Sequence, residues 1–472
     1  MIFPPFDRYL VTLRMTRPAG FHFNHGGAIN GLLCAAFGEH RLPEGAVPFA
    51  CESGRVRFEA GEPYNFGLTL IGEARRLGAA LQPGLARLGR TGPDRSQSLP
   101  ALQGNFEVEA IIALPPPDLD AELAALVGGA SRITLRFVSP LRIERRKALR
   151  KPGGTFVNER QLPALRLLRG LWGRIFWLSY GRSASTTERD TQRPSLPTDL
   201  DVTEREVTWL RVPRGGFDHD KRDDSCALGG LLGYIALTGV TEEWLPWLVL
   251  GSHIHLGGDT AFGFGRYQID SGNGKNDPFR PGKRLLESLA SPKVLGKALD
   301  HVVGQSDLAG VDGVAPAGLL GARGKVLATL AGDLSADRYK ASPLRGFVLP
   351  ESNGRGRLLA VPTVRDRIAQ CATHGLLSTA MEKLFEDRTP RFGGKRSGRA
   401  GGGDSRICSR SRERFKSETG WEESFSDVDW AKLTKTLEPL YPGEALIGLL
   451  RDWAHARVEF MSTLFHRQYD LL

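Results

Sequence analysis

The chain has 472 residues, 41% hydrophobic and 25% charged, which is the composition of an ordinary globular protein and enough length for two or three domains. Its formal net charge of +10 favours a polyanionic partner, most simply nucleic acid. No apolar run reaches membrane-spanning length, and the five cysteines are scattered without metal-ligand spacing. We therefore expect a cytoplasmic protein with reduced thiols, no membrane segment, no metal and no other cofactor.

The first quarter of the chain alternates strand and helix patterns. Strands are predicted by alternating apolar residues at 8–15, 55–59, 64–72 and 106–113. Helical spacing predicts a short helix at 28–37, ended by Gly38, and partly helical structure over 70–88. This strand–helix–strand–strand–helix–strand order predicts a ferredoxin-like domain over residues 1–125.

The triple proline at 115–117 marks the end of this domain, and a second domain of similar size is predicted over residues 126–270. Its elements are of the same kinds as those of the first domain. They are strands from Ile133, at 207–212 and at 267–269, a long amphipathic helix at 162–180 and a polar linker at 183–198.

Glycines and histidines gather in the last part of the second domain, residues 229–270. The segment His255-Leu256-Gly257-Gly258 is followed by Gly263-Phe264-Gly265-Arg266, just before the last predicted strand. Unhindered N–H groups of glycines can cradle a phosphate, and Arg266 adds a cation beside them. The simpler alternative is a tight turn that needs positive φ, with Arg266 in solvent.

This glycine-rich stretch closely resembles the C-terminal end of the CRISPR repeat-processing endoribonuclease family, of the Cas-six type within the RAMP superfamily. In that family a G-x-G-x-G-type loop follows an H-x-G-like segment and precedes the last strand of a ferredoxin-like domain. The resemblance covers roughly residues 1–270 and implies an α+β fold with two tandem ferredoxin-like (RRM-like) domains. It departs from the family at Gly258-Asp259, where a basic residue is common, and His255 is expected to orient the loop.

The resemblance implies a metal-independent endoribonuclease that cuts CRISPR precursor RNA within the repeat. The RNA 2′-OH attacks the adjacent phosphate and leaves 2′,3′-cyclic phosphate and 5′-OH ends, a reaction helped by an acid, a base and cations. In the family the catalytic histidine lies on or just after the first helix. This placement implies His40 first and His25 second, although either residue could instead be a surface or capping histidine.

RNA contacts are expected at the glycine-rich loop and at groups of cations, because RNA presents a phosphate backbone. Five cations fall within the seven residues 145–151, although any single one could simply be solvated. The candidate RNA-binding residues are Gly257, Gly258, Gly263, Gly265, Arg266, Arg145, Arg146, Lys147 and Arg222.

The chain changes in kind after a linker predicted at 271–290. Three later segments resemble consecutive parts of the fingers region of group-II-intron-type reverse transcriptases. They are DLAGVDG at 307–313, RYKASPLR at 338–345 and RLLAVPTVRDRIAQ at 357–370. The resemblance implies that residues 291–472 form an incomplete reverse-transcriptase fingers/palm fragment, while the Gly-, Ser- and Arg-rich residues 393–417 are expected to be disordered.

Polymerase chemistry needs two carboxylates that hold two metal ions. Aligning the segment FSDVDW at 425–430 with the family puts Gly420 where the first metal-binding aspartate should be. The family's second catalytic segment carries an Asp-Asp pair. The Asp-Asp pair of this sequence, Asp223-Asp224, lies in the second ferredoxin-like domain and not in the reverse-transcriptase-like region. We therefore expect no reverse transcription from this chain.

Three functions remain open from the sequence. The leading hypothesis is a repeat-cleaving endoribonuclease whose partners are CRISPR repeat RNA and CRISPR effector or adaptation proteins. The second is a non-catalytic RNA-binding module of a CRISPR effector or spacer-acquisition complex, since no clear partner base accompanies His40. The third is that the C-terminal third binds RNA–DNA hybrids as a polymerase accessory.

Overall fold

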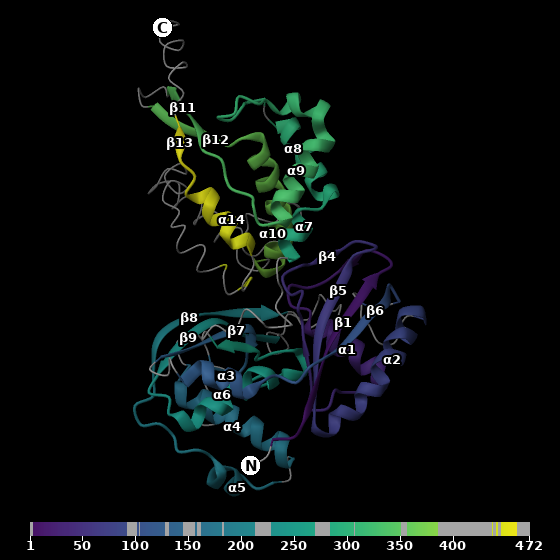
Figure 1. Ribbon diagram of the computed structural model, residues 1–472, viewed down its shortest axis with the longest axis vertical. Coiled ribbons are helices and arrows are strands. Elements are labelled where there is room, and N and C mark those ends of the chain that lie inside the picture. Colours follow the sequence, from purple (N-terminus) through teal and green to yellow (C-terminus); the bar gives the residue numbers. More distant parts are fainter. Residues whose placement is uncertain are drawn as a thin grey trace, which may run out of the picture. The chain divides into compact units, whose positions relative to one another are not determined.

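The computed structural model of the chain divides into two compact units, Met1–Pro281 and Gly282–Leu472 (Figure 1). None of the helices within the described residues is long and apolar enough to cross a membrane. The described residues are 3–91, 102, 104–127, 132–144, 156–157, 162–181, 184–212, 228–269, 284–305, 307–350, 356–385, 437, 440–441 and 445–459.

The first half of unit 1 is a four-stranded sheet with strand order β3-β5-β1-β6, in which all pairings are antiparallel. Its strands are β1 (Phe6–Met15), β3 (Ala46–Phe49), β5 (Pro63–Ile71) and β6 (Phe106–Leu114). Helix α1 (Gly26–Phe37) connects β1 to β3, and η1 (Gly72–Leu77) and α2 (Gly78–Thr91) connect β5 to β6. β2 (Ala19–Gly20) and β4 (Arg57–Phe58) form a separate two-stranded sheet.

Alternation along β1 explains how this half packs. Val11 and Leu13 are fully buried, and they share one core with Leu33 of α1 and Leu85 of α2. Because successive side chains of a strand point to opposite faces, both helices cover the same face of the sheet. Each such buried side chain stabilises the fold by roughly 1.5–3 kcal/mol.

The second half of unit 1 has a sheet of order β10-β7-β9-β8, again antiparallel throughout. Its strands are β7 (Ile133–Leu141), β8 (Asp201–Val212), β9 (Leu228–Thr238) and β10 (Tyr267–Ile269). The helices of this half are α3 (Leu119–Val127), α4 (Ala164–Tyr180), α5 (Thr186–Gln192) and α6 (Leu245–Ile254), with the short turns η4 (Glu242–Trp244) and η5 (Thr260–Phe262). Leu135, Leu168 and Trp244 are fully buried in one core that joins β7, α4 and η4.

Unit 2 consists of helices beside a small sheet of order β12-β11-β13 (Figure 1). Its helices are α7 (Arg284–Leu289), α8 (Pro292–Gln305), η7 (Pro316–Ala322), α9 (Arg323–Ser335), α10 (Val364–Phe385) and α14 (Ala445–Ala454). Its strands are β11 (Leu344–Pro350), β12 (Gly356–Val361) and β13 (Val458–Glu459). β11 and β12 pair as an antiparallel hairpin, and β13 pairs with β11 in parallel.

The α+β class expected from the sequence is confirmed, but several local predictions are wrong. The strand predicted at 55–59 shrinks to β4 outside the main sheet, and β3 takes its place there. Residues 228–238, for which no element is predicted above, form strand β9. The predicted linker at 271–290 ends in helix α7, whose Leu285, Leu286 and Leu289 are buried.

The polar stretch predicted as a linker at 183–198 contains helix α5. Ser185 is its N-cap, and the Ser185 hydroxyl accepts a hydrogen bond from the N–H of Glu188 (3.0 Å). The Glu188 carboxylate in turn accepts one from the N–H of Ser185 (3.1 Å). This reciprocal capping box satisfies two backbone donors that a helix start leaves unpaired.

Candidate functional site

His40 lies in a bend just beyond the end of α1, and its side chain is exposed. The helix ends because Gly38 adopts a left-handed conformation with φ 69°, and the N–H of Glu39 donates to the carbonyl oxygen of Cys34 (2.9 Å). Within the described part of the chain, no residue forms a hydrogen bond or ion pair with the His40 side chain. The imidazole is therefore accessible to a polymer bound on the surface.

His25, the second catalytic candidate, is a core residue. It is 1% exposed, and its Nε2 lies 2.9 Å from the carbonyl oxygen of Arg55. Its ring packs against Phe21, with centroids 4.6 Å apart, and against Phe58 and Tyr64. Because the imidazole is enclosed by this aromatic cluster, an RNA backbone cannot reach it, and the structure speaks against a catalytic role for His25.

The glycine-rich loop between α6 and β10 is built on left-handed backbone. Gly257, Gly263 and Gly265 have φ values of 87°, 76° and 81°. A Cβ at Gly265 would lie 1.7 Å from the carbonyl oxygen of Leu256, and one at Gly257 would lie 2.3 Å from that of Arg142. The glycines are therefore required by conformation and close backbone approach, as the simpler alternative predicted.

Most of the loop's N–H groups are used inside the fold. Gly258, Gly263 and Gly265 donate to the carbonyl oxygens of Arg142, Thr260 and Pro140, each at 2.9 Å. These three N–H groups are therefore not available to cradle a phosphate, which corrects the expected binding role of this loop. Gly258 is the exposed glycine among the four candidates.

Replacing Gly265 with alanine is expected to destabilise unit 1 by about 2 kcal/mol or more, because the substitution combines positive φ with a backbone clash. Gly258→Ala is the matched control, since its Cβ would meet only the Arg142 carbonyl oxygen at 3.9 Å and its φ is not positive. Urea unfolding of both variants checks this expectation. Equal midpoints for the two variants would contradict the structural role of Gly265.

Arg266 and His255 hold the loop in place. Arg266 is 7% exposed, and its guanidinium lies 4.0 Å from the ring centroid of Phe49. His255 is buried, and its Nδ1 lies 3.1 Å from the carbonyl oxygen of Phe264. Arg266 is therefore a packing residue between β10 and β3, and its predicted contact with RNA is not supported by this placement. Arg145, Arg146, Lys147 and Arg222 lie outside the described residues.

A cationic cleft of about 690 Å³ lies in unit 1 beside the exposed end of the glycine-rich loop. Gly257 and Gly258 form part of its wall. The charged residues that line it are six arginines and three acids, namely Arg142, Arg166, Arg169, Arg174, Arg189, Arg193, Glu44, Glu144 and Asp190. This site was not predicted from the sequence. Its signal was the spacing of Arg166, Arg169 and Arg174 along one predicted helix.

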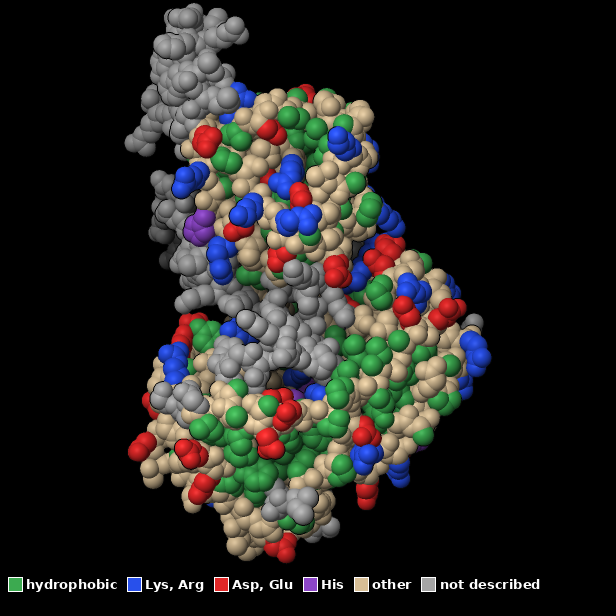
Figure 2. Space-filling model, in the orientation of Figure 1, with side chains coloured by type: hydrophobic (Ala, Val, Ile, Leu, Met, Phe, Trp, Pro, Cys, Tyr) green, Lys and Arg blue, Asp and Glu red, His purple; other side chains and the backbone are tan. Residues whose placement is uncertain are grey.

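The cations of unit 2 are distributed differently. On the face drawn in Figure 2, Lys and Arg side chains alternate with Asp and Glu over the described surface of this unit. Arg323 and Asp300, for example, form an exposed ion pair. The part of unit 2 seen in this view therefore has no patch of a single sign. Among the described residues of the whole chain, no group of His, Cys, Asp or Glu is placed to hold a metal ion.

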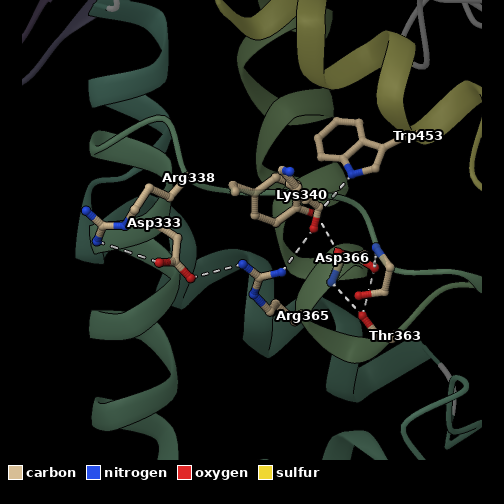
Figure 3. Close-up of polar contacts among 9 residues, drawn as sticks. Asp333, Arg338, Lys340, Thr363, Arg365, Asp366 and Trp453 are labelled. Carbon is tan, nitrogen blue, oxygen red and sulfur yellow. Dashed lines mark hydrogen bonds and ion pairs between the residues drawn. The ribbon is translucent and has the colours of Figure 1, made fainter.

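The reverse-transcriptase-like segments of unit 2 meet around one buried carboxylate, Asp366 (Figure 3). Asp366 is 1% exposed and accepts hydrogen bonds from the Tyr339 hydroxyl, from the N–H of Ser342 (3.0 Å) and from the Thr363 hydroxyl (2.9 Å). The indole N–H of Trp453 donates to the Tyr339 hydroxyl (3.0 Å). Burial, and next the charge of Asp366, raise the pKa of Tyr339, so its hydroxyl remains a donor.

Arg365 connects the hydrogen-bonded residues around Asp366 to helix α9. Its guanidinium forms an ion pair with Asp333 (3.0 Å), donates to the carbonyl oxygen of Lys340 (3.2 Å) and lies 4.5 Å from the ring centroid of Tyr339 (Figure 3). Asp333 also pairs with Arg338 (3.8 Å). Arg365 is thus a structural link within unit 2 rather than a solvated cation at a helix start.

The DLAGVDG segment packs against the same place. A Cβ at Gly310 would lie 2.6 Å from Cα of Thr363, so only glycine permits this approach. Arg367 donates to the carbonyl oxygen of Leu308, and Arg345 donates to that of Ala309 (3.4 Å). The three segments that resemble reverse transcriptases are therefore one interlocked piece of structure.

Comparison with known proteins shows which proteins these features resemble. Residues 135–267 match the family model of the CRISPR-associated endoribonuclease Cas6. A chain of a structure described as a partial Cas6-RT-Cas1–Cas2 complex superposes with a TM-score of 0.67 and 18% identity, covering 96% of this chain and 77% of that one. The resemblance expected from the sequence, a Cas6-type region followed by a reverse-transcriptase-like region, is thereby confirmed.

Two further matches define how far the likeness extends. A Cas6-RT-Cas1–Cas2 complex gives a TM-score of 0.67 with 18% identity, covering 96% of this chain and 48% of that one. Protein YkfC of Escherichia coli (strain K12) is 33% identical over 112 residues. That match covers 23% of this chain and 28% of protein YkfC, so the chain spans little more than a quarter of this curated relative.

Proposed function

We propose that unit 1 is a metal-independent endoribonuclease that cuts CRISPR precursor RNA within the repeat. The observation that carries the proposal is the exposed His40 at the end of α1, in a chain whose residues 135–267 match the Cas6 endoribonuclease model. The βαββαβ element order and the strand orders β3-β5-β1-β6 and β10-β7-β9-β8 support two tandem ferredoxin-like domains. Their boundary lies before α3, which packs on the core of the second half, rather than at the predicted residue 125 inside that helix.

The proposed reaction is an internal transfer within the RNA. The 2′-OH loses its proton to a base and attacks the adjacent phosphorus, the bond to the 5′ oxygen breaks, and an acid protonates that leaving oxygen. His40 takes one of these two proton-transfer roles, because imidazole exchanges protons near neutral pH. The products are a 2′,3′-cyclic phosphate and a 5′-OH, and no metal ion takes part.

The glycine-rich loop has a positioning role in this proposal. η5 of the loop packs against α1, the helix that precedes His40, and Asn30 of α1 donates to the carbonyl oxygen of Ala261 (2.8 Å). Gly26 of α1 also lies so close to Phe262 that a Cβ there would be 1.9 Å from the Phe262 carbonyl oxygen. The loop thus holds α1 in place, and the position of α1 determines where His40, just beyond its end, lies.

We further propose that residues 291–472 are a reverse-transcriptase fingers/palm fragment without polymerase activity within this chain. The interlocked segments around Asp366 support the fingers assignment. The matched Cas6-RT-Cas1–Cas2 structures suggest adaptation proteins as partners besides the repeat RNA. The cytoplasm is the location that we propose for this chain. Primer extension on an RNA template should give no product, and extension products would contradict this assignment.

The test of the nuclease is an incubation of purified protein with the repeat RNA of its own CRISPR array in EDTA. A single cut within the repeat that leaves cyclic phosphate ends is the expected result. A cut that requires added magnesium, or product ends with a 3′-OH, would overturn the proposed chemistry.

One observation favours a second candidate function. No described residue is hydrogen-bonded to His40, so no base or acid partner is evident beside it. This arrangement suits a non-catalytic RNA-binding module of a CRISPR effector or spacer-acquisition complex. Tight binding of repeat RNA without any cut in the same assay would establish this alternative.

A further inference from the structure

The cationic cleft of unit 1 has one face of helix α4 as its floor. Residues 166, 169, 170, 173, 174 and 177 recur at the three- and four-residue spacing of one helix face, and all six line the cleft. Two of them, Gly170 and Gly173, bring no side chain. The floor is therefore bare helix backbone between arginines on either side.

The two glycines are not explained by packing within the protein. A Cβ at Gly173 would meet no atom within 4 Å, and one at Gly170 would meet only Cδ1 of Leu256, at 3.8 Å. Glycine is the least favourable residue in a helix interior after proline, so helix stability disfavours both. Gly173 is buried and Gly170 partly buried, yet both leave room for a Cβ, so the two costly glycines indicate that another molecule approaches the helix closely here.

Arg174 supplies an independent sign of a missing ligand. It is 9% exposed, and its Nε donates to the carbonyl oxygen of Ile254 (2.9 Å). Its Nη2 is buried and has no hydrogen-bond partner among the residues that the structure describes. Burial lowers the pKa of Arg174 to about 10 although the charge of Glu44, in the same cleft, acts in the opposite direction, so the side chain is still a cation at neutral pH. A buried cation of this kind is stabilised by an anion.

The cleft is electropositive, because its six arginines outnumber the three acids that line it, Glu44, Glu144 and Asp190. Arg142 is paired with Asp259 (2.7 Å), and Arg189 and Arg193 share Asp190 (3.1 and 3.4 Å). The pKa of Asp190 lies below its usual range, because Arg189 donates to the carboxylate and the neighbouring arginines add positive charge. The side chain of Arg169 is exposed at the cleft and forms no ion pair with any described residue.

We propose that this cleft binds the phosphodiester backbone of RNA, with Arg169 and Arg174 contacting phosphate oxygens and the chain lying across Gly170 and Gly173. The proposal rests on the proposed function, since it assigns a second RNA contact to the same enzyme. The volume of about 690 Å³ is within the range of ligand-binding clefts. The exposed Gly257-Gly258 end of the glycine-rich loop borders the bound strand.

The test fills the cleft without removing a charge. Gly173→Leu is expected to weaken binding of repeat RNA by about tenfold while the unfolding temperature does not fall, because leucine favours helix and no atom lies within 4 Å of the added Cβ. Gly332→Leu is the control for placing leucine in a helix, since Gly332 is also interior to a helix and a Cβ there would meet nothing within 4 Å, although Gly332 is exposed and Gly173 is buried. It should bind RNA like the wild type.

A second variant tests the phosphate contact itself. Arg169→Gln is expected to lower the slope of log affinity against log salt by about 0.7, the value for one lost phosphate contact on a single strand. If Gly173→Leu and Arg169→Gln both bind repeat RNA with the affinity and the salt dependence of the wild type, the proposed role of the cleft is overturned. The proposed nuclease activity is not affected by that result. A wild-type protein that neither binds nor cuts repeat RNA would overturn both. Stabilisation of the wild type by a free mononucleotide, but not by RNA, would reassign the cleft to a small phosphate ligand.

Discussion

Replacing His40 with alanine is expected to slow cleavage of repeat RNA by about 100-fold or more, because general acid–base catalysis contributes at least that factor. The side chain is exposed and makes no described hydrogen bond, so RNA affinity and the unfolding temperature should not change. Single-turnover cleavage with saturating protein, together with binding by fluorescence anisotropy, measures the two effects separately.

The matched control is His25→Ala. Its ring fills the aromatic cluster around Phe21 and Tyr64, so its removal should destabilise unit 1 by about 2–4 kcal/mol, as truncation of buried side chains does. Folded His25→Ala protein, at a temperature below its transition, should still cut RNA. Wild-type cleavage rates from His40→Ala, or loss of cleavage from a well-folded His25→Ala, would show that the assignment of the histidines is reversed or wrong.

Replacing Asp366 with alanine is expected to destabilise unit 2 by about 3 kcal/mol or more. The substitution leaves the Tyr339 hydroxyl, the Ser342 N–H and the Thr363 hydroxyl without their acceptor, and each buried unpaired group costs about 1–3 kcal/mol. Hydrogen exchange of α9 and α10 is the suitable measurement, because a two-unit chain need not unfold in one step.

Asp300→Ala is the control for this prediction. Asp300 belongs to the same unit and accepts a hydrogen bond from Arg323, which lowers the pKa of its carboxyl, but the pair is exposed. Exposed ion pairs contribute little to stability, so exchange rates should hardly change. Equal losses of hydrogen-exchange protection in Asp366→Ala and Asp300→Ala would contradict the role of Asp366 as the central acceptor of the hydrogen bonds from Tyr339, Ser342 and Thr363.

The architecture of unit 1 could be predicted because its strands carry a clear alternation. Val11 and Leu13 on β1 repeat at a period of two, and the helix-ending Gly38 stands where the apolar spacing of α1 stops. Helix α5 could also have been found, since Ser185 and Glu188 have the spacing of a capping box. Strand β9 was obscured by its glycines, which are poor strand formers on propensity alone.

The site was harder to predict because burial and hydrogen bonding depend on distant parts of the chain. His25 and His40 both lie near α1, and only the packing of Phe21, Phe58 and Tyr64 separates a core histidine from an exposed one. The sequence likewise cannot reveal that the N–H of Gly265 already donates to Pro140, more than a hundred residues away. Only the tertiary structure shows which histidine is exposed and which N–H groups are already hydrogen-bonded.

The arginines of α4 illustrate an intermediate case. Arg166, Arg169 and Arg174 lie on the helix predicted at 162–180, but arginines on an amphipathic helix do not by themselves indicate a binding site. What distinguishes them is the pair of glycines on the same face and the burial of Arg174. A helical-wheel comparison of charged and glycine positions over 162–180 would have found the arrangement.

The most direct test of the nuclease is a repeat RNA with a single 2′-deoxy nucleotide at the cut site. If the 2′-OH attacks, the protein should not cut this RNA, although it should bind it as tightly as the unmodified repeat. A 2′-deoxy nucleotide elsewhere in the repeat should have no effect. Cleavage of the modified RNA at the same position would mean that water or another nucleophile attacks the phosphate. That result would contradict the mechanism assigned to unit 1.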